Sequence, residues 1–183
     1  MSVRNELLSD ILTAIQTGGS TEAQIQEITK GVNGYGFYAN STATELSPLV
    51  VSDSSTVALI FDTATRETRL PDGYTTMFSG GRIVSNDVDG MFDVRVGFWA
   101  APSNNNGAFG INIDISAAGD GSIVIAEDAR RMVRGSNTYQ FYTIPLPVFS
   151  AETFVNNGGL VRFSAIDGDI SLYGIQLLVS KVG

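Results

Sequence analysis

The stretch Met91-Phe92-Asp93-Val94-Arg95-Val96-Gly97-Phe98-Trp99-Ala100 decides the fold class of this chain. From Phe92 to Phe98 every second side chain is large and apolar, and charged or small residues occupy the positions between them. This period of two is that of a β-strand with one buried face and one wet face, which is typical of antiparallel sheets. Trp99 falls on the wet face of this predicted strand.

The same alternation returns in residues 109–116, after a turn-rich loop at residues 101–108. We expect the two stretches to pair as one long β-hairpin. The second strand is predicted to bury Phe109, Ile111, Ile113 and Ile115, and to place Asn112, Asp114 and Ser116 on its wet face.

Further short runs with this period, separated by turns rich in Gly, Asp and Asn, predict more strands. They lie at residues 35–39, 49–52, 56–61, 67–70, 74–78, 122–125, 138–144, 160–166 and 170–179. Gly174 interrupts the last of them and is predicted to mark a β-bulge. So many short strands, with almost no helix after residue 33, predict a mainly β protein. We expect an antiparallel two-sheet β-sandwich, with the jelly roll as the preferred topology.

Residues 1–33 have a helical period instead, which predicts a short N-terminal helical arm before a sandwich domain at residues 34–183. Gly18-Gly19 ends a first helix, and Thr21 with Gln24 forms a capping box that starts a second one. Ile25, Ile28 and Val32 then mark an apolar face, and Lys30 followed by Gly31 suits the C-terminus of the second helix. The apolar face of the first helix consists of Val3, Leu7, Leu8, Ile11, Leu12 and Ile15. These faces either pack on the domain itself or dock on a partner.

Composition excludes much chemistry. The 183 residues include no Cys and no His, which excludes thiolate zinc sites and both Ser-His-Asp and Cys-His catalysis. Lys and Arg number 11 against 19 Asp and Glu, for a net charge of −8. Because no basic stripe is present, we expect neither nucleic acid nor a membrane surface as a partner. No signal segment and no apolar run of membrane-spanning length is found, and we expect no cofactor and no bound metal.

Pairs of carboxylates at 87 and 89, 127 and 128, and 167 and 169 are the remaining candidates for catalysis, since a glycosidase needs two. Asp beside Gly is also ordinary turn chemistry, and we favour that interpretation. Asp87-Val88-Asp89-Gly90 resembles the start of a calcium loop, but Phe98 stands where an EF-hand places its Glu. Arg130, Arg131 and Arg134 form the only local basic group, and we expect it to be a solvated loop.

Trp99 is the only tryptophan, and it stands just before the polar loop residues Asn104, Asn105 and Asn106. Exposed aromatic rings beside polar groups can bind carbohydrate, and Tyr35, Tyr38, Tyr74, Tyr139, Tyr142 and Tyr173 could contribute to such a site. Aromatic residues are equally enriched at subunit interfaces. We favour an interface at Trp99 and keep ligand binding as the alternative.

The layout of the whole chain resembles the accessory virion proteins of tailed bacteriophages: capsid decoration proteins, head fibres and small tail proteins. The features that carry the resemblance are the helical arm, a Gly-rich break at residues 31–36, a sandwich with few lysines, and a long apolar last strand at residues 170–179. Many such proteins are homotrimeric jelly rolls whose N-terminal arms attach them to the particle.

The resemblance therefore implies a non-enzymatic virion structural protein, a trimeric capsid decoration or fibre-like subunit anchored by its arm. Its partners would be further copies of itself and other virion proteins, such as the major capsid protein. It would be made in the host cytoplasm and function in the virion. The alternative is a receptor- or carbohydrate-binding module of a tail or fibre.

Overall fold

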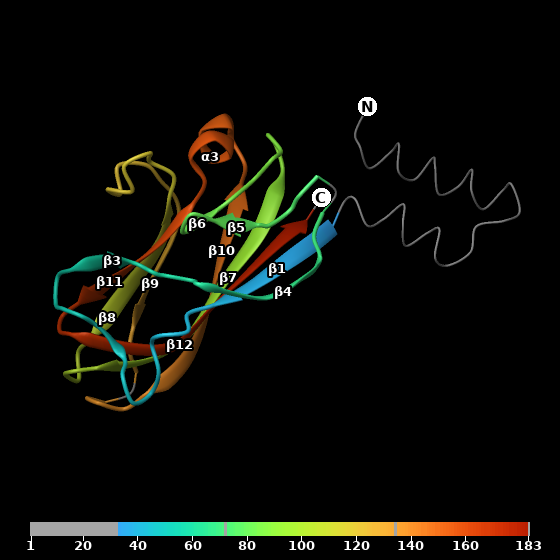
Figure 1. The fold of residues 1–183 in the computed structure, drawn as a ribbon. Coiled ribbons are helices and arrows are strands. Elements are labelled where there is room, and N and C mark those ends of the chain that lie inside the picture. Colours follow the sequence, from blue (N-terminus) through green and yellow to red (C-terminus); the bar gives the residue numbers. More distant parts are fainter. Residues whose placement is uncertain (1–32, 72, 134, 183) are drawn as a thin grey trace, which may run out of the picture.

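Two antiparallel sheets pack face to face in a computed structural model that describes residues 33–71, 73–133 and 135–182 (Figure 1). The predicted mainly β sandwich is confirmed. The predicted helices of the arm lie outside the described residues, so the division of the chain into arm and sandwich stays a prediction.

The larger sheet has six strands in the order β10-β7-β12-β1-β4, with β2 also paired to β12. The long last strand, β12, pairs with β7 along one edge and with both β1 and β2 along the other, and it contains a bulge. Gly174 has φ 60°, and the register of β12 against β7 shifts between Tyr173 and Gln176, which confirms the predicted bulge. The strands are β1 (Asn33–Ala39), β2 (Leu49–Val51), β4 (Thr63–Arg69), β7 (Met91–Pro102), β10 (Gln140–Phe149) and β12 (Ile170–Val182).

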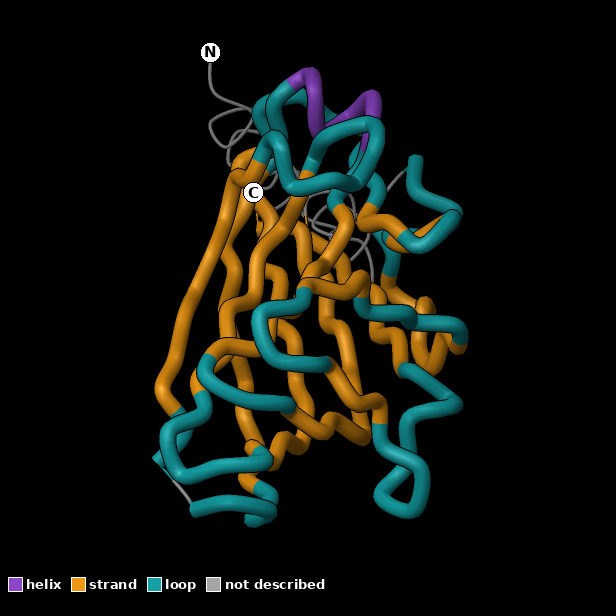
Figure 2. The backbone as a smooth tube through the Cα atoms, turned by 90° about the vertical axis from the view of Figure 1, so that its left-hand side faces the viewer, coloured by secondary structure: helices purple, strands orange, loops and turns teal. Residues whose placement is uncertain are grey.

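The smaller sheet has four strands in the order β3-β11-β8-β9. The chain passes repeatedly from one sheet to the other between consecutive strands, which is the connectivity of a jelly roll. The strands are β3 (Thr56–Ala58), β8 (Ala108–Asp114), β9 (Val124–Arg131) and β11 (Leu160–Ile166); β5 (Phe78–Ser79) and β6 (Arg82–Ile83) form a separate small pair. The short helix α3 (Glu152–Asn157) lies at one end of the sandwich (Figure 2).

The predicted hairpin of residues 91–100 with 109–116 is wrong. β7 pairs with β10 and β12 in one sheet, whereas β8 pairs with β9 and β11 in the other. The two inner faces oppose each other across the core, where the rings of Phe98 and Phe109 are 5.4 Å apart. Alternation showed correctly which side chains are buried, but facing strands and neighbouring strands share that pattern.

Several predicted boundaries also change. The run at 74–78 is mostly loop, with only Phe78 in a strand, and the strand from Thr56 ends at Ala58 instead of 61. The runs at 122–125 and 138–144 overlap strands that extend to Arg131 and Phe149. The helix α3 was not predicted, and its Phe154 is fully buried against Phe92, with ring centroids 6.1 Å apart. This ring closes one end of the core.

Asp114 and Ser116 are not on a wet face, contrary to the prediction, because both are buried. Asp114 lies at the end of β8, where its carboxylate accepts hydrogen bonds from the backbone N–H groups of Ser116 (2.8 Å) and Gly121 (2.7 Å). Arg162 lies 3.7 Å from the same carboxylate. Burial alone would raise the pKa of Asp114, but these hydrogen bonds and the Arg162 charge together hold it below its ordinary value. Asp114 therefore organises the loop that follows β8.

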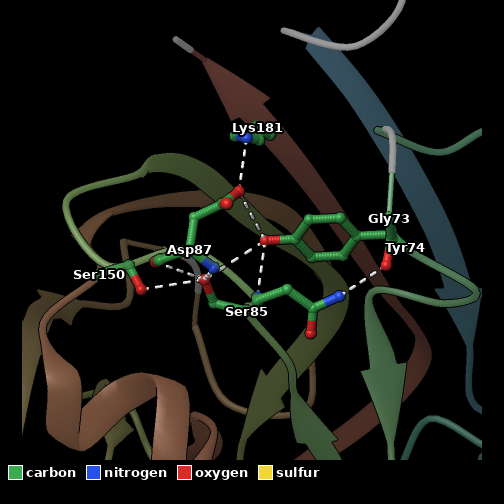
Figure 3. A network of polar contacts seen from close by, with 7 residues as sticks. Gly73, Tyr74, Ser85, Asp87, Ser150 and Lys181 are labelled. Carbon is green, nitrogen blue, oxygen red and sulfur yellow. Dashed lines mark hydrogen bonds and ion pairs between the residues drawn. The ribbon is translucent and has the colours of Figure 1, made fainter.

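A polar network, here named the Asp87 clamp, fastens the last strand to the loop before β7 (Figure 3). Lys181 Nζ donates to Asp87 Oδ2 at 2.5 Å, and the Tyr74 hydroxyl donates to the same oxygen at 3.3 Å. The hydroxyl of Ser150 donates to that of Ser85 at 2.9 Å, and Ser85 in turn lies 3.3 Å from the Tyr74 hydroxyl. The Lys181 side chain is 13% exposed, so its ion pair is shielded from water on one side.

Replacing Lys181 by Met should keep the packing of its stem but leave Asp87 without its cation. We expect the free energy of unfolding to fall by about 1–2 kcal/mol, since the pair is partly buried. The control is Arg130→Met, which breaks the exposed pair with Asp128 and should cost about 0.5 kcal/mol or less. Urea unfolding at one fixed protein concentration measures both, and equal losses would contradict a stabilising role of the clamp.

Candidate functional site

Four aromatic rings form a continuous cluster on the outer face of the larger sheet, and we call it the aromatic face. Trp99 on β7 lies 5.4 Å from Phe141 on β10 and 6.0 Å from Tyr173 on β12, the latter ring being nearly parallel to it. Tyr139 extends the cluster with its ring 4.9 Å from Tyr173. Trp99 and Phe141 remain 39% and 45% exposed. This face therefore presents apolar ring surface to its surroundings.

Two glycines make room for these rings. A Cβ at Gly97 would lie 3.3 Å from the Phe141 ring, and one at Gly174 would lie 3.4 Å from the Trp99 ring. Phe141 thus covers the backbone of β7, and Gly97 is buried although it lies on the outer face. Because the rings rest on backbone and on each other, the aromatic face is a preformed surface.

The free edge of β10 carries a second signal. In β10 the inner positions hold Tyr142, Ile144, Leu146 and Val148, and Phe141, Thr143, Pro145, Pro147 and Phe149 face outward. Proline lacks the N–H that a further strand would need, and it is tolerated in sheets at edges. Pro145 and Pro147 therefore oppose extension of the sheet by another chain. Association on this side has to use the face of the sheet rather than its edge.

The strands that carry the aromatic face have no net charge on their outward positions, and the nearby Glu45, which acts on Tyr173, lies outside these strands. On the outward positions of β7, β10 and β12 the charged side chains among the described residues are Asp93 and Arg95. They form an ion pair with each other, with Arg95 Nη2 2.7 Å from Asp93 Oδ2. Depletion of charge at the centre of a patch, together with Tyr, Trp and Phe, is the compositional signature of protein interfaces.

The outer face of the smaller sheet is different. Its outward positions hold the polar or charged residues Asn112, Glu127, Arg162 and Ser164 beside the exposed Ile166, and the hydroxyl groups of Ser164 and Thr56 lie 2.7 Å apart. Polar outer positions are normal for an antiparallel sheet with one wet face. The aromatic face is therefore a property of one side of the sandwich.

Tyr173 illustrates the electrostatics of the cluster. Desolvation by its neighbours raises the pKa of the Tyr173 phenol, and the negative charge of Glu45 and the phenol of Tyr139 act in the same direction. The phenol, which is neutral at physiological pH even at its ordinary pKa, can donate a hydrogen bond there.

The predicted loop residues have a structural task. The side-chain amide of Asn104 donates to the carbonyl of Asp167 at 2.6 Å, and its oxygen accepts from the N–H of Asn106 at 2.9 Å. The oxygen of Asn105 accepts from the N–H of Ser136 at 2.8 Å. Asn104 and Asn105 thus tie loops together at the end of the sandwich, and the Asn106 side chain is exposed. These hydrogen bonds go to other loop residues, and a site shared with Trp99 stays a prediction.

The carboxylates at 87, 89, 167 and 169, which the sequence offers as candidates for catalysis, have structural roles. Asp89 and Asp167 have φ values of 69° and 58°, the left-handed conformation that Asp tolerates in turns. Asp169 accepts a hydrogen bond from the Asp53 N–H at 2.8 Å, and Asp87 belongs to the clamp. Among the described residues, no group of three or more His, Cys, Asp or Glu side chains has the arrangement of a metal site.

Two residues of the basic group lie in a strand and not in the expected loop. Arg130 and Arg131 lie in the edge strand β9, and Arg130 Nε donates to Asp128 at 2.9 Å. Arg134 lies outside the described residues. Within the part of the chain that the structure describes, no helix is long and apolar enough to cross a membrane.

The sequence identified Trp99, Tyr139 and Tyr173 as candidates but missed Phe141. Phe141 stands at an outward position of the alternating residues 140–149, of which the predicted strand included only the part up to residue 144. Tyr38, Tyr74 and Tyr142 are buried in the core and do not join the aromatic face. The apolar arm residues from Val3 to Ile15 lie outside the described residues.

No protein-family model and no curated protein matches the sequence. Among solved structures, the chain is similar to Eiger TNF from S. frugiperda, with 12% identity over 83% of this chain and 92% of that chain, and a TM-score of 0.51. It also matches PRD1 vertex protein P5, with 12% identity over 82% of this chain and 73% of that one, at a TM-score of 0.45. A third match, at 0.42, is an arabinose-bound MgGH51 α-L-arabinofuranosidase, with 15% identity over 80% of this chain and 27% of that one.

At these identities only the fold follows, and the two matches with TM-scores below 0.5 carry no argument. The likeness to Eiger TNF shows that the chain has a similar jelly-roll fold. A jelly roll is also the fold that the resemblance to accessory virion proteins implied.

Proposed function

We propose that this chain is a non-enzymatic structural protein of a bacteriophage virion, a homotrimeric capsid decoration or fibre-like subunit. The observation that carries the proposal is the aromatic face, an exposed and nearly uncharged surface on a protein of net charge −8. Copies of an acidic chain repel one another unless they meet where charge is absent. The aromatic face is such a place, and its rings supply apolar area worth about 25 cal/mol per Å² buried.

The geometry of the face supports a closed symmetric assembly. The cluster lies on the flat of the sheet, while Pro145 and Pro147 oppose open-ended addition of strands at the β10 edge. In such an assembly, the aromatic face of each copy would contact the next copy around a rotation axis, and the outer face of the smaller sheet would point away from that axis. Three copies are the number that the resemblance to virion proteins implies.

The N-terminal arm is the proposed anchor. Its first segment carries the apolar residues from Val3 to Ile15, and a trimer would present three copies of it to another virion protein, such as the major capsid protein. Binding through several arms at once raises the effective affinity without new contacts. The absence of His and Cys from the sequence supports a role in adhesion rather than catalysis.

The alternative is a receptor- or carbohydrate-binding module, because parallel exposed rings such as Trp99 and Tyr173 can also stack on a sugar. Trp99 is the only tryptophan, so titration of glycans against its fluorescence discriminates the two functions. We expect no saturable change with host-surface glycans. A saturable quench that is lost in Tyr173→Ser would favour the binding module.

The native mass tests the proposed assembly. We expect light scattering after size-exclusion chromatography to give about three times 19.4 kDa for the wild-type chain. The double variant Trp99→Ser, Phe141→Ser should shift toward the monomer, because it removes the central rings of the contact. The matched control is Ile166→Ser, which removes a 40% exposed side chain from the other sheet and should leave the mass unchanged. A wild-type monomer, or a double variant that stays trimeric, would contradict the proposal.

Deletion of residues 1–33 tests the anchor. The sandwich should remain folded, as judged by circular dichroism, because residues between Tyr38 and Val179 already form a continuous hydrophobic core. The truncated chain should no longer co-sediment with particles that lack the protein, whereas the full chain should. Truncated chains that still bind particles would show that the arm is not the anchor.

A further inference from the structure

A second apolar surface lies at the other end of the larger sheet. Phe149 on β10 is directly opposite Met91 on β7, and Lys181 on β12 is opposite Phe92, so Val182 comes beside Met91. The three side chains are 58%, 49% and 46% exposed. They form what we call the apolar row, which crosses three adjacent strands on the outer face. The Asp93–Arg95 ion pair lies between this row and the aromatic face.

The apolar row ends where the described chain begins. The strand next to β12 is β1, and its first residue, Asn33, pairs with Val182. Figure 1 shows the C-terminal end of β12 beside the start of β1. The segment before Asn33 therefore enters the sandwich at the end of the row.

The sequence of that segment matches the row in spacing. Its apolar residues are Ile25 and Ile28 within the predicted helix and Val32, which follows Gly31 at the Gly-rich break. At a rise of 1.5 Å per residue, Ile25 and Ile28 are about 4.5 Å apart along the helix axis. Neighbouring strands are about 4.8 Å apart, so side chains on two adjacent strands are spaced almost alike. A helix laid across the strand ends can thus place Ile25 and Ile28 over two adjacent strands, and Val32, which directly precedes Asn33, can cover the third.

We propose that residues 21–32 of the same chain cover the apolar row, with Val32 over Val182, Ile28 over Met91 and Ile25 over Phe149. The direct connection at Asn33 gives this segment a higher effective concentration at the row than any other chain has. The inference goes beyond the proposed function and does not depend on it. It assigns the second arm segment to the sandwich and leaves residues 3–15 to reach a partner.

Cysteine pairing tests the contact, since the chain contains no cysteine of its own. In full-length Ile28→Cys, Met91→Cys, mild oxidation should form a disulfide within one chain, seen as a faster band on a non-reducing gel that returns on reduction. The control is Gln26→Cys, Met91→Cys, whose arm thiol lies on the opposite side of the helix. We expect the first pair to form at least about tenfold faster, because a disulfide needs Cα atoms within about 7 Å.

A disulfide between chains, equal rates for both pairs, or no disulfide in either would overturn the proposal. Hydrogen exchange of the full-length chain supplies a second readout. Residues 21–32 should be protected in the wild type and exchange at least about tenfold faster in Met91→Asp, Phe149→Asp. Both substituted side chains are exposed, and unchanged protection of β11 would confirm that the sandwich is still folded. Unchanged protection of residues 21–32 in that variant would also overturn the proposal.

Discussion

The fold depends on the contact of Phe98 with aromatic rings from the opposite sheet. Its ring lies 5.4 Å from Phe109 and 5.5 Å from Phe163, and Tyr142 stacks on it from the neighbouring strand at 5.9 Å. Burying such rings contributes about 1.5–3 kcal/mol each. Because β7 must direct Phe98 inward, the period of two directs Trp99 outward. The exposed position of Trp99 follows from the core, and the glycines beneath the rings then let Phe141 and Tyr173 gather around it.

Much of the fold could be predicted from the sequence, because alternation reports directly which face of a strand is buried. The strands around Phe92 and Phe163 and the bulge at Gly174 were predicted for this reason. Alternation carries no information on which strand lies beside which, so β7 and β8 were wrongly joined in a hairpin. Asp114 was misplaced because its burial depends on the loop that folds back over it. In the candidate site, the exposure of Trp99 could be predicted because it stands at an outward position of an alternating strand. Its contact with Phe141 depends on the pairing of β7 with β10, which alternation does not report.

The two outer surfaces divide the proposed tasks. The aromatic face lies near one end of the larger sheet and suits contact between copies, while the apolar row lies at the end where the chain enters the sandwich. The Asp87 clamp fastens β12 at this second end, since Lys181 is paired with Gly34 in β1 and bound to Asp87 in the loop before β7. A load applied through the arm would thus pass from β1 to β12 and into the loop before β7. A protein attached by its arm needs such a rigid point of entry.

Acrylamide quenching of Trp99 fluorescence tests the central claim most directly, because the chain has a single tryptophan and it lies in the aromatic face. If copies associate through this face, the assembled protein should show blue-shifted emission and weak quenching, and dilution to monomers should make Trp99 readily quenched. Emission and quenching that are the same in the assembled and the dissociated protein would contradict the account, since Trp99 would then be as exposed in the assembly as on the isolated sandwich.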